Sequence, residues 1–126
     1  MAPNLNTELR LKFLNTIRIL KKEFPTAYPV YIRTRKKWNG YYGLMEFKDG
    51  KNPHFVITLR RESYGVMLDC LFHEWAHART FSLVQKELDV KHWHDESWAV
   101  EYSKIIRHFY ENAENYKEIS AKMCPN

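Results

Sequence analysis

The chain has 126 residues, of which 44% are hydrophobic and 15% aromatic, and its formal net charge is +5. This composition excludes a mainly disordered protein, and the length suits one core, so we expect a single domain over residues 1–126. Two cysteines exclude a disulfide framework. Residues 1–10 lack the apolar block of a signal peptide and no apolar run reaches the ~18 residues of a membrane span, so we expect a cytoplasmic protein without membrane contact.

The N-terminal half predicts one helix followed by three strands. Apolar side chains recur at helical spacing over residues 6–24, and Pro25 ends that pattern. The strands are expected at residues 28–35, 40–48 and 54–60. An Asp49–Gly50 turn separates the second strand from the third.

The C-terminal half predicts two more helices. The first covers residues 64–82, with Ser63 as a candidate N-cap, and the second covers residues 96–116, with Asp95 as a candidate N-cap. Residues 83–95 connect them without a clear pattern. Three strands grouped between helices predict an α+β fold, in which helices pack on one face of a small antiparallel or mixed sheet.

The motif His73-Glu74-Trp75-Ala76-His77 lies within the predicted helix 64–82. Histidines four residues apart share one helix face and can bind one Zn²⁺, while Glu74 can reach a water beside the metal. The alternative is that both histidines merely decorate a helix surface. Their apolar neighbours argue against this, because a half-buried His-Glu-His cluster without a metal would leave polar groups to satisfy.

Zinc needs a third protein ligand and an open position for water. His94 stands just before the last predicted helix, where a rigid neighbour would hold it, and we favour it. His92 lies two residues away and Glu101 lies near the apolar face of that helix, so either residue remains an alternative third ligand.

The stretch from Leu68 to Ala78 resembles the active helix of the SprT-like zinc metallopeptidases, and the segment His94-Asp95-Glu96-Ser97-Trp98 is similar to the family's later His-Gly-x-x-Trp/Phe motif. Asp95 replaces the usual glycine, and the family's cysteine-rich zinc ribbon is absent. The resemblance covers residues 54–110 and implies a minimal zincin-like fold. It also implies that His73, His77 and His94 bind zinc and that Glu74 is the catalytic residue.

Some residues near the motif have two readings. Cys70 precedes His73 by three residues and could face the metal, although a small buried residue is the commoner role. Asp69 could orient the ring of His73, or be a solvated helix charge. Tyr64 and Tyr102 could donate to an oxyanion, yet both also fit the apolar stripes of their helices.

A basic segment at residues 33–38 ends in Trp38. Such a segment could contact a phosphate backbone while Trp38 stacks on a base, although most segments of this kind are solvated connections between strands. Nucleic acid is therefore a possible partner beside a protein or peptide substrate.

These features together predict a zinc-dependent metallopeptidase in which Glu74 activates a zinc-bound water against a peptide carbonyl. An edge strand, the second or the third, could hold an extended peptide by main-chain pairing. Two alternatives remain: a DNA-associated binding or regulatory module with structural zinc, for which Cys70 could be a ligand, and a zinc hydrolase acting on a non-peptide amide.

Overall fold

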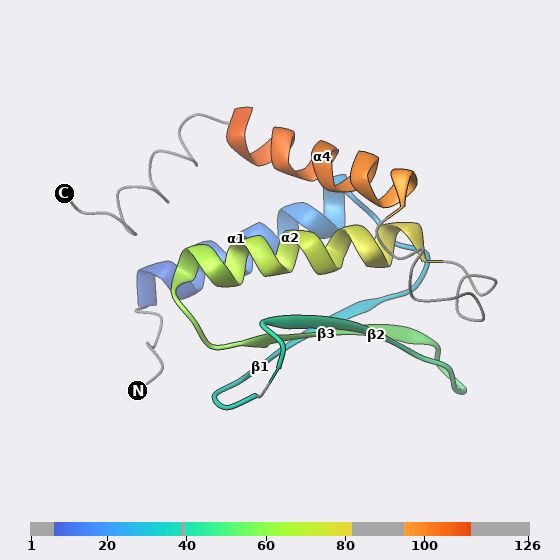
Figure 1. Cartoon of the computed structure of the whole chain (residues 1–126), viewed down its shortest axis with the longest axis horizontal. Coiled ribbons are helices and arrows are strands. Elements are labelled where there is room, and N and C mark those ends of the chain that lie inside the picture. The colour runs from blue at the N-terminus through green and yellow to red at the C-terminus, as the bar shows by residue number, and fades with distance from the viewer. Residues whose placement is uncertain (1–6, 39, 82–94, 112–126) are drawn as a thin grey trace.

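The computed structural model describes residues 7–38, 40–81 and 95–111, and its elements follow the predicted order (Figure 1). The elements are α1 (Thr7–Glu23), β1 (Val30–Arg35), β2 (Gly43–Lys48), β3 (His54–Arg60), α2 (Tyr64–Thr80) and α4 (Glu96–Glu111). Three helices and a three-stranded mixed sheet in the described part of the chain confirm the α+β class. None of the described helices is long and apolar enough to cross a membrane.

The observed ends of β1, β2 and α2 differ by a few residues from the predicted ends. Strand β1 begins at Val30 rather than at residue 28, because Pro29 has no N–H to give to a ladder and only its carbonyl accepts, from Phe55. Strand β2 begins at Gly43 rather than at residue 40. Helix α2 ends at Thr80 rather than at residue 82, because Phe81 is extended, with φ −66° and ψ 137°. Residues 82–94 and 112–116, which include most of the predicted connector, lie outside the described residues.

The strand order in the sheet is β1-β3-β2. Strand β3 pairs in parallel with β1 and antiparallel with β2, so the sheet is mixed. The third strand is therefore central, and its predicted role as a peptide-binding edge is wrong. Strand β2 remains an edge within the described part of the chain.

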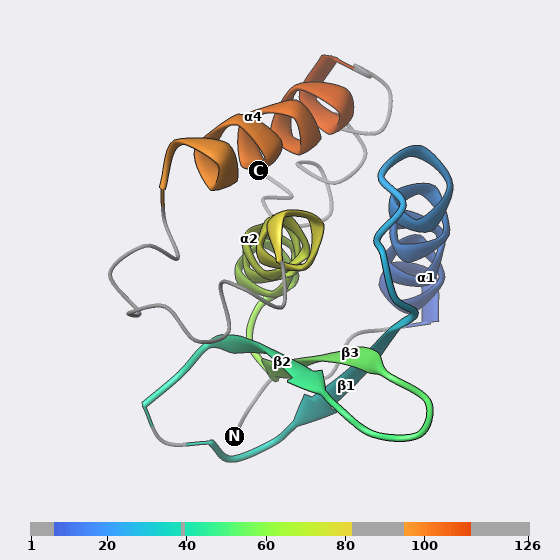
Figure 2. The ribbon, with the colours of Figure 1, turned by 90° about the vertical axis from the view of Figure 1, so that its right-hand side faces the viewer.

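The inner face of the sheet carries the core. Phe55, Ile57 and Leu59 alternate along β3 and are fully buried, and their neighbours Val30 on β1 and Met45 on β2 are nearly so. Figures 1 and 2 show all three helices on this side of the sheet, with α1 beside α2. The expectation that the helices cover one face is confirmed.

Helix α2 is buried on almost every side because it lies between the sheet and α4 (Figure 2). Its apolar residues Tyr64, Met67, Leu68, Leu71 and Trp75 are all buried. Phe72, on the face turned towards α4, stacks on Phe109 with ring centroids 4.7 Å apart.

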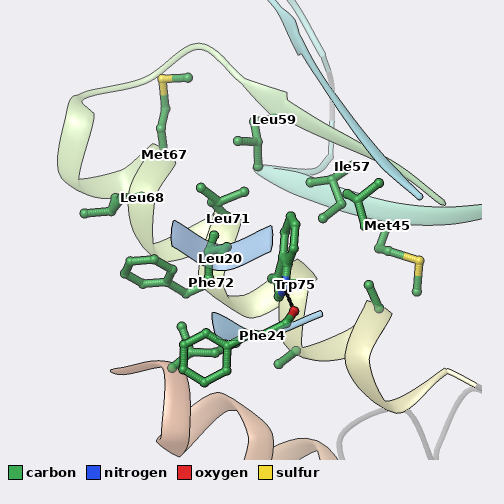
Figure 3. Close-up of a cluster of buried hydrophobic side chains, with 14 of the residues drawn as sticks. Leu20, Phe24, Met45, Ile57, Leu59, Met67, Leu68, Leu71, Phe72 and Trp75 are labelled. Carbon is green, nitrogen blue, oxygen red and sulfur yellow. Dashed lines mark hydrogen bonds between the residues drawn. The ribbon is translucent and has the colours of Figure 1, made fainter. Parts of the chain in front are cut away.

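Trp75 joins α2 to the end of α1. Its ring is fully buried, and Figure 3 shows it between the sheet residues Met45 and Ile57 and the α1 side of the core. Its Nε1 donates a 2.9 Å hydrogen bond to the carbonyl of Phe24, which satisfies the one polar atom of the side chain. Truncating a side chain of this size in a core typically costs about 3–5 kcal/mol. This contact is one of those that hold α2, and hence its histidines, against the rest of the core.

Candidate metal and catalytic centre

His73 and His77 lie on the strip of α2 between the face that packs on α4 and the face that packs on β2. Their ring centroids are 5.0 Å apart. The His77 residue is only 6% exposed, whereas the side chain of His73 is 35% exposed. The four-residue spacing thus places both imidazoles together, with one of them reaching solvent, as the sequence predicted for this pair.

Glu74 is held by the backbone of strand β2. The N–H of Met45 donates a buried 2.9 Å hydrogen bond to Oε1 of Glu74. The other oxygen, Oε2, lies 3.9 Å from Nε2 of His73, which is too long for a hydrogen bond. One carboxylate oxygen is therefore anchored, and the other faces the histidine.

Burial raises the pKa of Glu74 to about 7, against the lowering effect of the Met45 hydrogen bond. The cause is the loss of water around the charged form. No cation is among the contacts that shift this carboxyl in the protein alone. A positive charge placed beside it would favour the ionised form again.

Gly43 lets β2 come close enough for the Met45 contact. A Cβ at this position would lie 3.2 Å from Cβ of Cys70, 3.2 Å from a methyl group of Leu59 and 3.4 Å from Cγ of Glu74. Any larger residue would have to push the strand away from α2 or shift its neighbours. A glycine at this position thus allows β2 to pack closely against the helix that carries the motif.

Trp98 of α4 forms the opposite wall of the site. Its ring stacks on His77 with centroids 5.4 Å apart and meets the edge of His73 at 4.8 Å. Its Nε1 donates to the carbonyl of His73 at 3.3 Å. Asp95 caps this end of α4, as predicted, by accepting a 3.0 Å hydrogen bond from the backbone N–H of Trp98.

Tyr102 extends this wall by one turn. It stacks on Trp98 at 5.1 Å, and its hydroxyl donates a 2.7 Å hydrogen bond to Asp69. Burial and the neighbouring carboxylate raise the pKa of Tyr102, so it stays protonated. Asp69 accordingly holds α4 against α2 through a tyrosine. Its suggested partner, the ring of His73, forms no hydrogen bond that the structure shows with it.

The structure also places Cys70, Tyr64 and Ser63, the other residues that the sequence singled out on or beside this helix. Cys70 is a free, half-buried thiol packed beneath Gly43, which matches the small-residue role. Tyr64 is buried against Phe13 at the start of α2, so it belongs to the core. Ser63 stands at the N-cap position, but its side chain makes no capping hydrogen bond.

Glu101, an alternative third ligand, lies in an ion pair. Its carboxylate is 3.2 Å from a guanidinium nitrogen of Arg79 and 3.4 Å from Nζ of Lys104. Binding a metal would require it to leave both cations, which disfavours the two-His, one-Glu arrangement. His92 and His94 lie outside the described residues.

The side chains of His73 and His77 are of a type that zinc prefers as ligands. Zinc takes imidazole nitrogens, and two rings one helical turn apart on the same face can direct nitrogens to one point. Within residues 7–38, 40–81 and 95–111, no group of three or more ligand side chains forms a site. The predicted third ligand, His94, lies outside these residues.

The sequence could not reveal two members of this site. The Met45 donor is a backbone amide, so its residue type carries no signal. Gly43 begins an apolar strand, but its purpose depends on which helix residues lie opposite. Trp98 could be found, because it keeps its spacing from His94 in the motif.

Comparisons with protein-family models, with curated proteins and with solved structures found no match. The assignment of the site therefore rests on its residues and geometry.

Proposed function

We propose that this protein is a zinc-dependent metallopeptidase of the SprT-like kind, in which His73, His77 and His94 bind zinc and Glu74 is the general base. One observation carries the proposal. A buried carboxylate is anchored by one oxygen to the Met45 amide and turns its other oxygen towards a histidine pair. A zinc site that only supports structure has no need of such a carboxylate. Burying a carboxylate without a cation beside it is also unfavourable.

The residues of the chain divide the chemistry between them. Zinc, when bound, supplies Lewis acidity towards water and a carbonyl oxygen. Glu74 takes a proton from the attacking water through Oε2 while Oε1 stays on Met45, and it then gives that proton to the leaving amine nitrogen. Trp98 shields the face of His77 from water, which strengthens electrostatic interactions at the site.

Strand β2 supports a peptide as the substrate. Tyr42 accepts a hydrogen bond from the N–H of Arg60, so alternate residues of β2, starting with Gly43 and Met45, direct their main-chain groups away from β3. The Met45 N–H points this way and is taken by Glu74, so a peptide would pair with the other outward main-chain groups of β2. An extended peptide added along this edge would run past Glu74, and main-chain pairing of this kind binds peptides without requiring a particular side chain.

The test compares zinc content and cleavage in the wild type, Glu74→Gln and Glu46→Gln. Glu46 is a half-exposed carboxylate on strand β2, and it contacts Arg33 and Lys48. The Glu46→Gln variant therefore controls for the loss of one negative charge. We expect one zinc per chain in all three proteins, and cleavage of an unfolded protein such as reduced casein in all but Glu74→Gln.

Two results would contradict the peptidase. One tightly bound zinc in a wild type that cleaves no protein would favour the DNA-associated module with structural zinc. Hydrolysis of small amides without hydrolysis of any protein would favour the non-peptide hydrolase.

A further inference from the structure

Several basic and aromatic side chains lie on the outer face of the sheet, opposite the helices. Strand pairing places residues of the three strands in rows across this face, and the end row consists of Arg35, Arg60 and Tyr42. The next row contains Arg33, whose Nε donates a 2.7 Å hydrogen bond to the fully buried Thr58. Figures 1 and 2 show no described element over this side of the sheet.

Five residues form what we call the aromatic–basic cluster: Arg35, Trp38, Tyr41, Tyr42 and Arg60. The guanidinium of Arg60 lies 4.0 Å from the ring centre of Tyr42 and donates to the carbonyl of Trp38 at 3.2 Å. Trp38 in turn contacts Tyr41, with centroids 5.7 Å apart, and lies under Arg35 at 5.9 Å. Tyr41 and Tyr42 nonetheless remain 54% and 55% exposed. Large rings are thus held in place from one side and open to solvent on the other.

The charge around the cluster is positive. Lys36 and Lys37 are exposed and directly precede Trp38 in the chain, and no carboxylate of the described residues pairs with either. The carboxylates nearby are already engaged, because Glu62 binds Arg60 at 2.7 Å and Glu46 lies 3.8 Å from Arg33. Cations therefore remain available at the end of the sheet where the exposed rings gather.

A further exposed ring, that of Tyr31, lies on the same face beyond Arg33. Tyr31 is 60% exposed and meets His54 edge-on at 5.3 Å. It stands four residues before Arg35 on β1, which corresponds to roughly 13 Å along a strand. Two ring sites separated in this way, with Arg33 between them, suit a flexible chain that carries flat groups at intervals and negative charge throughout.

We propose that the outer sheet face binds single-stranded nucleic acid, with bases stacking on Tyr42, Trp38 and Tyr31 and phosphates contacting Arg35, Lys36 and Lys37. Single strands expose the flat faces of their bases, and stacking on aromatic rings together with a positive surface is how proteins bind them without reading sequence. A duplex keeps its base faces stacked inside, and an acidic peptide has no flat groups for exposed rings. Both partners would use the charge and leave the rings unused.

This surface is separate from the candidate metal centre. Arg35, Arg60 and Tyr42 form the end row of the outer face, and Trp38 and Tyr41 contact this row from the β1–β2 connection. His73 and Glu74 lie instead on α2, which packs on the inner face of the sheet (Figure 2). Nucleic-acid binding should then be the same in Glu74→Gln as in the wild type, and it neither requires the peptidase nor depends on it.

The test measures binding of the full chain to fluorescent dT15 by anisotropy, with rU15, a 15-base-pair duplex and polyglutamate as the other probes. We expect dT15 and rU15 to bind comparably, because neither stacking nor charge reads the sugar, and the duplex and polyglutamate to bind at least about fivefold more weakly. Absence of strand binding, or equal binding of polyglutamate, would overturn the proposal.

Matched variants separate stacking from charge. Tyr42→Ala should weaken dT15 binding about five- to a hundredfold while Tyr42→Phe retains it, and Tyr110→Ala, which removes a comparably exposed ring on α4, should have no effect. Lys36→Gln with Lys37→Gln should lower the slope of log affinity against log salt by about 1.4. The exposed pair Lys21 and Lys22 on α1 provides the control of equal charge. If the two lysine pairs behave alike, or if Tyr42→Ala binds normally, the outer face is not the site.

Discussion

Replacing Glu74 with glutamine should stabilise the zinc-free protein at pH 8 and leave its stability almost unchanged at pH 4. Glutamine keeps the size of the side chain and an oxygen for the Met45 amide, but it carries no charge. The buried carboxylate has a pKa raised to about 7 from 4.5, so the folded state binds its proton more tightly than the unfolded state does. Stability then falls as the pH rises from about 4.5 to about 7, and the loss is complete above that window.

The magnitude follows from the shift. A change of 7 − 4.5 = 2.5 pKa units corresponds to at most about 3 kcal/mol. A buried glutamine N–H group without an acceptor would offset part of this stabilisation. We therefore expect the free energy of unfolding of Glu74→Gln at pH 8 to exceed that of the wild type by about 1–3 kcal/mol. In a chain of this length that is a rise in melting temperature of up to roughly 10 °C.

Thermal or urea unfolding with a chelator present, at pH 4, 6 and 8, measures the difference. Zinc should shrink the advantage of Glu74→Gln, because a dication near the carboxylate favours the ionised form. Glu46→Gln, which removes a half-exposed charge, should stay within about 0.5 kcal/mol of the wild type at every pH. Destabilisation by Glu74→Gln at pH 8 would refute the reasoning, since it would mean that the buried charge has a favourable partner.

Three further variants or reagents test other parts of the site. Gly43→Ala should destabilise the protein by about 1 kcal/mol and lower peptidase activity, measured by melting and by casein cleavage, because its Cβ would lie 3.2 Å from Cys70; unchanged activity would show that the position of β2 is not critical. In a Cys124→Ser background at pH 9, Cys70 should react with iodoacetamide about 50-fold more slowly than a free thiol, since burial raises its pKa to about 11; reaction at the rate of a free thiol would contradict its packing. His94→Ala should lower zinc affinity far more than His92→Ala, as equilibrium dialysis would show; the reverse result would make His92 the third ligand.

The helices of this protein could be predicted closely because their signals are local. The stripe predicted over residues 6–24 places Phe13, Leu20 and Phe24 in the core, as helical spacing requires. Asp95 was predictable as a cap because the side chain and its N–H partner lie three residues apart. The motif helix was predictable for the same reason, since the contact between His73 and His77 depends only on the helical repeat.

The order of the strands could not be predicted, because it depends on contacts between distant residues. Periodicity identifies β3, yet nothing in residues 54–60 indicates that this strand lies in the middle and pairs in parallel with β1. That order leaves β2 at an edge of the described sheet, beside α2. The Met45–Glu74 hydrogen bond joins residues 29 positions apart and is a consequence of it.

The Met45 contact has a further meaning for the motif. A His-Glu-x-x-His pattern on a helix states which side chains share a face, but it does not state which carboxylate oxygen is available for chemistry. Here the backbone of β2 occupies Oε1 of Glu74 and leaves Oε2 towards His73. Under the proposed function, a peptide pairing with β2 would contact the same strand that orients Glu74, so the binding of substrate and the positioning of Glu74 would be mechanically linked. Substitutions that shift β2, such as Gly43→Ala, should then lower kcat as well as raise KM, whereas a side chain that only bound the peptide would mainly change KM.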